Sequence, residues 1–332
     1  MRHHSPARRS LFSVLALLAI GAGLHSATAR ADGDFPPRQI RIVAPFSAGS
    51  GVDSIARLYA RRLGEQLKVP VIVENREGAG GMIGAAYAAR LPADGQTLLV
   101  ATTPFVVGPV TMGNAAYDPL KDFVAVGRIA VNPLALTVNP TVPARSMMEL
   151  IDYARANPGL LTYASSGPGT PSQLEMEALK AKLGIDIREV PYRSNAQALT
   201  DLIGGTVSMY YTVQSTSLGN VRAGQVRALA VASPAPTQAL PGVPVMAEAS
   251  GLPGYEAMVW YGFVMPKGTP DEIVKRLHQE VVDAARSPEV SAGVSQLGFE
   301  TSLSEPQAFA AQMAAEFDRT KAVLATRKAS GG

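Results

Sequence analysis

The chain repeats one pattern: a short run of alternating apolar residues, a turn rich in glycine and serine, and a stripe of apolar residues at helical spacing. The pattern is clearest over residues 39–68, where the alternating positions are Ile40, Ile42 and Ala44. Pro45 ends this strand, and a helical stripe follows at Ile55, Tyr59, Leu63 and Leu67. This stretch therefore predicts a strand, a tight loop and a helix.

The same alternation continues along the rest of the chain. Strands are expected over residues 69–74, 97–102, 123–138 with an interruption at Asn132-Pro133, 161–164, 187–190, 207–211, 227–231 and 257–265. Helices are expected over residues 82–89, 146–156, 172–183, 195–203, 218–223, 270–285, 288–297 and 306–328. Alternating strands and helices predict an α/β fold, in which ligands bind beyond the carboxyl ends of the strands.

The loop of the opening unit is a candidate anion site. Its small residues lead directly into a helix start, where unpaired backbone N–H groups and the helix dipole favour a carboxylate or a phosphate. The same residues have a second interpretation, because Ser50 and Asp53 fit a capping box that merely satisfies the helix start. The local pattern alone favours capping.

Two later loops repeat this arrangement of small residues before a helix start. Residues 75–81 are rich in glycine but do not fit a dinucleotide site, because the third glycine of that fingerprint would fall at Ile83. Residues 165–171 precede a helix for which Thr170 is the expected N-cap, Pro171 the first helical residue and Gln173 the partner in a capping box.

The first residues have the form of a secretory signal peptide. A basic start precedes an apolar run over residues 11–24, and Ala29-Arg30-Ala31 offers a small-residue cleavage site. Export and cleavage near Ala31 are expected, and Arg8-Arg9 leaves the twin-arginine route as a minor alternative to the secretory one. The apolar run is too short to span a membrane, and no later stretch reaches that length.

Cleavage changes the charge of the protein. Residues 1–31 contain four of the 30 basic residues and no acid, so 26 basic residues remain against 27 acidic ones and the formal charge becomes −1 instead of +3. The basic character belongs to the leader, and no nucleic-acid partner is expected. About 300 residues remain, enough for two domains or one large one.

The mature chain has little of the chemistry that a hydrolase needs. It contains no cysteine, and His278 is its one histidine, in a charged helical segment where a surface position is the expected account. No Gly-x-Ser-x-Gly elbow is present. A cysteine nucleophile, a disulfide and a Cys/His zinc cluster are excluded, and neither a catalytic residue, a metal nor a cofactor is expected.

Nine segments, in order and spacing, resemble the periplasmic substrate-binding proteins of tripartite tricarboxylate transporters, the Bug receptor family. They are Ile42–Arg57, Val71–Gly84, Ala93–Leu99, Tyr117–Phe123, Leu161–Thr170, Val190–Arg193, Ala198–Gly205, Ala223–Ala232 and Ala249–Tyr255. Each is weak alone, but together they cover nearly all of the mature chain.

The resemblance implies a bilobed type II periplasmic-binding-protein fold, with two α/β lobes and a ligand cleft between them. One lobe would comprise residues 35–138 and 261–328, and the other residues 139–260. The ligand would be a small carboxylated solute, a di- or tricarboxylate or an aromatic acid, and a hinge motion would close the lobes over it. The protein would be a monomer that delivers its ligand to the membrane permease subunits of the transporter.

Carried over residue by residue, the resemblance implies a set of ligand-binding positions. From the first lobe these are Phe46, Ser47, Ser50, Gly51, Gly80 and Thr103, with Asp53 ordering the first loop. From the second lobe they are Ser165, Ser166, Thr170, Tyr192 and Thr212. Hydroxyl and N–H groups at helix starts can hold an anion without a buried cation.

Three positions depart from the family pattern. Ala48-Gly49-Ser50 stands where the family usually has Pro-Gly-Gly, Gln173 where a histidine is often found nearby, and Tyr210-Tyr211-Thr212 where an aspartate often ends the strand. Without that aspartate a ligand amino group loses its partner, so a carboxylate without an amine is expected. A sensor that signals to a membrane partner such as a histidine kinase needs the same closing binder and remains the alternative function.

Overall fold

The computed structural model describes residues 35–113, 115–167, 170–192 and 194–329; the expected signal peptide lies outside these ranges. Its strands are β1 (Ile40–Ala44), β2 (Val71–Asn75), β3 (Thr97–Thr102), β4 (Phe123–Val138), β5 (Thr162–Ser165), β6 (Arg188–Pro191), β7 (Met209–Val213), β8 (Arg227–Val231), β9 (Met258–Pro266) and β10 (Glu300–Thr301). Its helices are α2 (Gly51–Leu67), η1 (Ala79–Gly81), α3 (Met82–Ala88), α4 (Thr103–Met112), α5 (Met147–Ala156), α6 (Pro171–Leu183), α7 (Asn195–Gly204), α8 (Gln214–Arg222), α9 (Met246–Ala249), α10 (Asp271–Arg286), α11 (Pro288–Gln296) and α12 (Pro306–Ala329).

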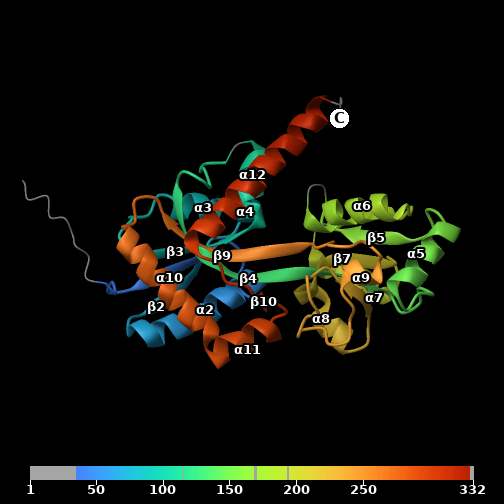
Figure 1. The fold of residues 1–332 in the computed structure, drawn as a ribbon, viewed down its shortest axis with the longest axis horizontal. Helices are drawn as coiled ribbons and strands as arrows, with labels where there is room; N and C mark the ends of the chain where they lie inside the picture. The colour runs from blue at the N-terminus through green and yellow to red at the C-terminus, as the bar shows by residue number, and fades with distance from the viewer. Residues whose placement is uncertain (1–34, 114, 168–169, 193, 330–332) are drawn as a thin grey trace, which may run out of the picture. The chain divides into compact units, whose positions relative to one another are not determined.

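The strands join in one sheet with the order β2-β1-β3-β9-β4-β7-β5-β6. β4 and β9 run side by side through its middle, antiparallel to each other (Figure 1). β3 is antiparallel to β9, so the first strand group (β1, β2 and β3) runs in the same direction as β4. The second strand group (β5, β6 and β7) runs in the opposite direction, because β7 is antiparallel to β4.

Each strand group has its own apolar core. Around the first group, Val43 and Leu99 pack with Trp260 and Phe309. Around the second, Leu136 and Tyr163 pack with residues that include Met176, Leu179 and Tyr211. Helices cover both faces of the first group: α2 contacts α10 and α11 on one side, and α4 contacts α3 and α12 on the other (Figure 1).

β4 is continuous through Asn132-Pro133, so the expected interruption there is wrong. Pro133 pairs in register with Met258 of β9. The N–H of Leu134 donates to the carbonyl oxygen of Ala257, on the edge of β4 that faces β9. Because successive backbone nitrogens of a strand point to opposite edges, the nitrogen of Pro133 faces the other edge. On that edge β10 pairs only as far as Val131 and β7 begins at Leu134. The missing N–H of proline is therefore not needed by the ladder.

The segment after β3 also differs from the sequence-based expectation. No helix was expected between residues 89 and 146, whereas residues 103–105 open helix α4. Pro104 lies in the first turn, where a helix does not need the backbone N–H that proline lacks. Thr103 is therefore placed at a helix start, as the loop residues of β1 and β5 are.

His278 is less exposed than a surface helix position would be. Its side chain is only 12% exposed. Nδ1 lies 2.8 Å from the carbonyl oxygen of Val126, and Nε2 lies 3.2 Å from Glu305 Oε2. The imidazole thus joins α10 to β4 and to the segment before α12, which is a structural role.

Candidate functional site

The carboxyl ends of the two strand groups approach each other along β4. β3 ends at Thr102, which is in register with Tyr261 of β9 and through it with Ala130 of β4. β7 ends at Val213, which is in register with Leu134 of β4. The two end points are four β4 residues apart, roughly 13 Å at the rise of a strand. Loops that follow strands of both groups therefore converge on one part of the sheet, where α/β proteins bind their ligands.

The first of these loops joins β1 to α2 and is shaped by Asp53. Ser50 is the N-cap, and its Oγ accepts a hydrogen bond from the N–H of Asp53 at 3.2 Å. The carboxylate of Asp53 does not complete a reciprocal capping box but accepts from the N–H of Gly49 at 2.9 Å. It also accepts from Arg57 Nε and Asn75 Nδ2, each at 2.9 Å.

Asp53 is only 3% exposed, yet its carboxylate favours the charged form. Burial acts to raise its pKa, but the hydrogen bonds from Arg57, Gly49 and Asn75 and the charge of Arg57 outweigh burial and lower the pKa. Asn75 also donates to the carbonyl of Phe46 at 3.0 Å. Asp53 thus orders the loop from within and leaves its outer face, with Ser47 and Gly51 exposed, to other partners.

The glycine-rich segment after β2 supports the same loop. Gly81 adopts a φ of 96°, and a Cβ there would stand 3.3 Å from the ring of Phe46. A Cβ on Gly84 would lie 2.6 Å from the carbonyl oxygen of Arg76 and 2.8 Å from Pro45. Gly80 is exposed beside them with a φ of 65°. The glycines therefore serve close packing that fixes Pro45 and Phe46.

Thr103 is the first residue of α4, and in the described part of the chain its hydroxyl group lacks the hydrogen-bond partner that a buried hydroxyl normally has. The oxygen is buried and has no hydrogen-bond partner among the described residues. Leaving a buried hydroxyl without a partner costs free energy. Thr103 thus offers a donor or an acceptor at the carboxyl end of β3.

The loop between β5 and α6 is a cluster of hydroxyl groups. Ser165 Oγ donates to Glu189 Oε1 and accepts from the N–H of Gly167. Ser172 Oγ accepts from the N–H of Ser166 at 2.9 Å. Thr170 occupies the N-cap position, but its hydroxyl makes no capping bond and donates to the carbonyl of Gly167 at 2.6 Å. The expected capping box at this helix is therefore wrong.

Tyr192 and Thr212 have different surroundings within the second strand group. The hydroxyl of Tyr192 donates to the carboxylate of Asp201 in α7 at 2.9 Å. The backbone N–H of Tyr192 donates to the carbonyl oxygen of Ser165 at 2.8 Å. Thr212 is buried on β7, two positions after Tyr210 and on the same face.

Tyr210 and Asn195 belong to this hydroxyl cluster, although the sequence did not single them out as site residues. Tyr210 is fully buried, and its hydroxyl lies 3.1 Å from Ser166 Oγ. Burial raises the pKa of Tyr210, against the opposing effect of hydrogen bonds from Ser166 and Thr212. Asn195, the first residue of α7, accepts from both Ser166 and Tyr210. The available signal was a polar pair, one residue within β7 and one at the start of α7.

Comparison with known proteins identifies the family. The chain matches the family described as tripartite tricarboxylate transporter family receptor over residues 55–328. Protein BugT of Bordetella pertussis is 33% identical to it over 316 residues, which are 95% of this chain and 96% of BugT. The chain belongs to this receptor family.

Two solved receptor structures resemble this receptor closely. Rpa4515 of R. palustris, described with adipate, is 35% identical with a TM-score of 0.76, and covers 88% of this chain and 98% of its own. MatC of Rhodopseudomonas palustris, with bound malate, is 29% identical with a TM-score of 0.69, and covers 87% of this chain and 99% of its own. The bilobed α/β fold of periplasmic binding proteins is confirmed, and the receptor is a solute-binding protein and not an enzyme.

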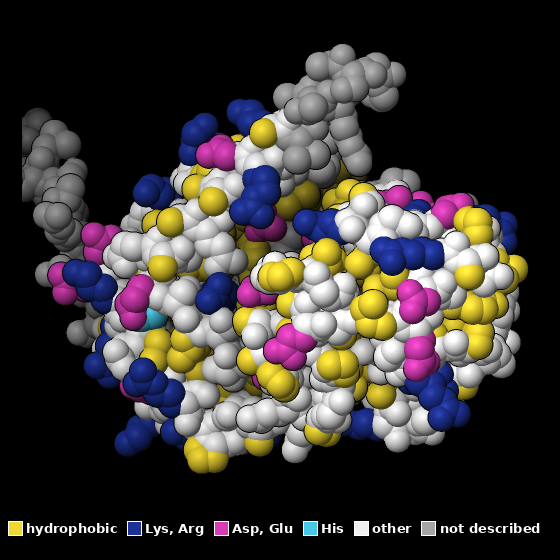
Figure 2. Space-filling view, turned by 45° about the vertical axis from the view of Figure 1, so that its right-hand side comes forward, with side chains coloured by type: hydrophobic (Ala, Val, Ile, Leu, Met, Phe, Trp, Pro, Cys, Tyr) yellow, Lys and Arg dark blue, Asp and Glu magenta, His cyan; other side chains and the backbone are white. Residues whose placement is uncertain are grey.

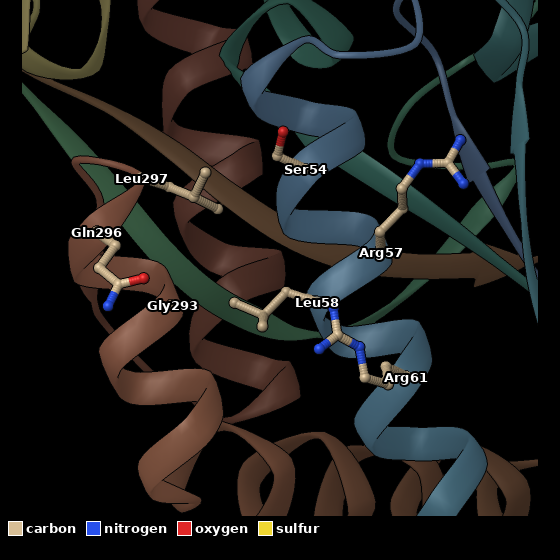
Figure 3. Close-up of a pocket in the computed structure, with 7 residues that line it drawn as sticks. All are labelled: Ser54, Arg57, Leu58, Arg61, Gly293, Gln296 and Leu297. Atoms are coloured by element: carbon tan, nitrogen blue, oxygen red, sulfur yellow. The ribbon is translucent and has the colours of Figure 1, made fainter. Parts of the chain in front are cut away.

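A separate groove in the receptor lies between α2 and α11, with a volume of about 270 Å³ (Figure 3). It is lined by Ser54, Arg57, Leu58, Arg61, Gly293, Gln296 and Leu297. None of these is among the expected ligand-binding residues. Leu58 fits against Gly293, where a Cβ would stand 2.8 Å from its Cδ2, and Arg61 pairs with Glu289 at 3.0 Å. The groove is best explained by helix packing.

The described part of the receptor shows neither a metal centre nor a membrane span. No group of three or more His, Cys, Asp or Glu side chains in it could hold a metal ion. None of its helices has the length and apolar character needed to cross a membrane. Figure 2 shows basic, acidic and apolar side chains scattered over one face of the receptor.

Proposed function

We propose that this receptor is exported to the periplasm, binds a small carboxylate and delivers it to the permease subunits of a tripartite transporter. The family supports the receptor role, and the adipate and malate of Rpa4515 and MatC support the ligand class. The observation that carries the proposal is the convergence along β4 of loops from both strand groups, each leading into a helix start.

The proposed site takes one carboxylate at the start of α2. Phe46, Ser47, Ser50 and Gly51 would contact it, and Gly80 and Thr103 would border it. The N–H groups of Gly51 and Val52 have no partner within α2, because a helix leaves its first N–H groups unpaired, whereas that of Asp53 donates to Ser50. The Asp53 carboxylate is held away by its bonds to Gly49, Arg57 and Asn75. The negative charge of Asp53 is thus compensated within the protein by Arg57, so it does not act as an unpaired repulsive charge.

The opposite side of the proposed site comes from the second strand group. Ser165, Ser166, Thr170, Tyr192 and Thr212 were expected there, and the network of Ser166 with Tyr210 adds polar groups to them. The acids nearby, Glu189 and Asp201, already accept hydrogen bonds from Ser165 and Tyr192. This supports a ligand without an ammonium group.

We propose that closure moves two lobes about β4 and β9. The lobes would comprise residues 35–138 with 261–328, and residues 139–260. Near Pro133 and Leu134 both edges of β4 change partners, from β9 to β8 on one edge and from β10 to β7 on the other. Such a crossing is a natural hinge because few residues need to change their backbone angles.

A thermal-shift screen of the mature protein, from Asp32, tests the function. Mono-, di- and tricarboxylates, aromatic acids and amino acids are compared, with calorimetry for each hit. A true ligand present at a hundredfold excess over its Kd adds about 2.7 kcal/mol of stability. A shift with one class of carboxylate supports the proposal. No shift with any acid contradicts it, and a best response to aspartate or glutamate contradicts the amine-free class.

Thr103→Val then tests the site itself. Because the hydroxyl of Thr103 has no partner among the described residues, its removal should leave the unliganded Tm unchanged or slightly higher. Ligand affinity should fall about tenfold if the hydroxyl contacts the ligand. Thr111→Val is the matched control on the same helix, since Thr111 is exposed and donates to Val107. Equal affinities for both variants would remove Thr103 from the site.

A further inference from the structure

Asn195 holds a fixed orientation at the start of α7. Its Oδ1 accepts from Ser166 Oγ at 2.7 Å and from Tyr210 OH at 2.9 Å. Tyr210 is fully buried, so this side of the amide faces the protein interior. Two hydroxyl donors on one oxygen define which end of the planar amide points inward.

The amide nitrogen of Asn195 must then point away from Tyr210. Asn195 is exposed, and within the described residues nothing accepts from its Nδ2. The side chain also lies at the N-terminal end of α7, whose N-cap Ser194 caps the N–H of Ala196. An oriented N–H donor therefore stands at the positive end of a helix, next to the loop of Ser166.

Two carboxylates of the described residues in the second strand group are already engaged. Glu189 accepts from Ser165 and Gln173, and Asp201 accepts from Tyr192 and Gln197. Neither carboxylate is a partner of Asn195. The donor is thus free to meet an acceptor from outside the protein.

We propose that Asn195 contacts the ligand and donates its amide N–H to an acceptor oxygen at the end of the ligand far from α2. Ser166 and Tyr210 are positioning residues that hold the amide in this orientation. The inference rests on the proposed carboxylate site and goes further, because it assigns a residue that determines ligand specificity. A carboxylate, carbonyl or hydroxyl oxygen is accepted at this position, and an ammonium group is rejected.

Asn195→Asp is the sharpest variant, because it keeps the inward oxygen and replaces only the outward NH2 with an oxygen. The two hydroxyls can still donate to it, so the unliganded Tm should be preserved. The probes are adipate, hexanoate and 6-aminohexanoate, which share one chain length and differ at one end, measured by calorimetry. Adipate affinity should fall tenfold or more, hexanoate affinity should change less than threefold, and 6-aminohexanoate should gain relative to adipate.

Ala196→Asp is the matched control. It adds the same charge to the next exposed residue of α7, so a general electrostatic effect would lower adipate binding equally in both variants. Tyr210→Phe tests the positioning role: adipate should lose affinity while hexanoate does not, whereas a merely structural defect would weaken both. Similar adipate affinities of Asn195→Asp and the wild type, or equal losses for adipate and hexanoate, would overturn the proposal.

Failure of this inference can be told apart from failure of the receptor function. If the wild-type protein binds neither adipate nor hexanoate, the role of Asn195 toward such acids is overturned. The broader screen then decides the function separately, because any other carboxylate that binds keeps the receptor proposal standing.

Discussion

Asp53 shows how one buried charge can organise a loop. Three donors from three places in the chain converge on its carboxylate: the N–H of Gly49, Nε of Arg57 and Nδ2 of Asn75. Together they more than offset the cost of burial, so the pKa is lowered. A lowered pKa means that this group stabilises the folded state above its ordinary pKa near 3.8 and that the stabilisation disappears as the pH falls through the folded value.

Asp53→Asn should therefore lower the free energy of unfolding by about 1–3 kcal/mol at neutral pH, since buried donors lose a charged acceptor. Urea denaturation at several pH values measures the effect. The difference from the wild type should be constant down to about pH 4 and shrink below it. Asp152→Asn, at an exposed position of α5, is the control and should change little. A difference that persists unchanged at pH 2–3 would contradict the account.

The connection between β2 and α3 shows how glycine can place a neighbouring element. At Gly84 an added Cβ would overlap the carbonyl of Arg76 and the ring of Pro45, so these elements touch through bare backbone. The contact fixes the first residues after β1, which lead to the proposed anion position. A local substitution here should consequently affect both stability and binding.

Gly84→Ala should destabilise the protein by about 1–3 kcal/mol, because a methyl group is forced into a filled space. It should also weaken the binding of whichever acid the screen identifies. Gly204→Ala is the matched control at the end of α7, where a Cβ meets nothing within 4 Å. That control should leave stability unchanged or raise it by about 0.4–1 kcal/mol. Chemical denaturation of both variants decides, and equal stabilities would refute the packing argument.

Across the whole molecule, buried polar contacts link the second strand group to the segment after α11. Gln214 follows β7 and is fully buried. Its Nε2 donates to the carbonyl of Gly298 at 3.0 Å, and its Oε1 accepts from Thr237 at 3.0 Å. Phe299 follows Gly298 in the chain, and its ring packs against Gly51 at the start of α2. The segment at residues 298–299 therefore touches elements next to both sides of the proposed site.

Gln214→Ala should reduce the free energy of unfolding by about 1–3 kcal/mol, because Gly298 and Thr237 would lose a buried partner. Gln225→Ala is the control: that side chain is exposed and accepts only a local bond from Asn220. Its cost should stay within about 0.5 kcal/mol. Thermal and urea unfolding compare the two, and equal effects would show that the buried link contributes nothing.

The sequence by itself determined the features that depend on neighbours a few residues apart. Apolar periodicity predicted most strands and helices, because it reflects which face of each element is buried. The capping bond of Ser50 to Asp53 was also readable, since its partners lie three residues apart. The resemblance to the receptor family added the fold, because the order of nine weak motifs is specific.

Only the tertiary structure decided what meets across elements. Ser166, Asn195 and Tyr210 come together from the loop after β5, from α7 and from β7, and their separation along the chain left no spacing to recognise. Thr170 donates to Gly167 in place of capping its helix, and Pro133 stays inside β4 because its partners change there. Strand order and register set these contacts, and both result from the packing of distant segments. Local sequence patterns set the elements, while the sheet determined how their polar ends combine into a site.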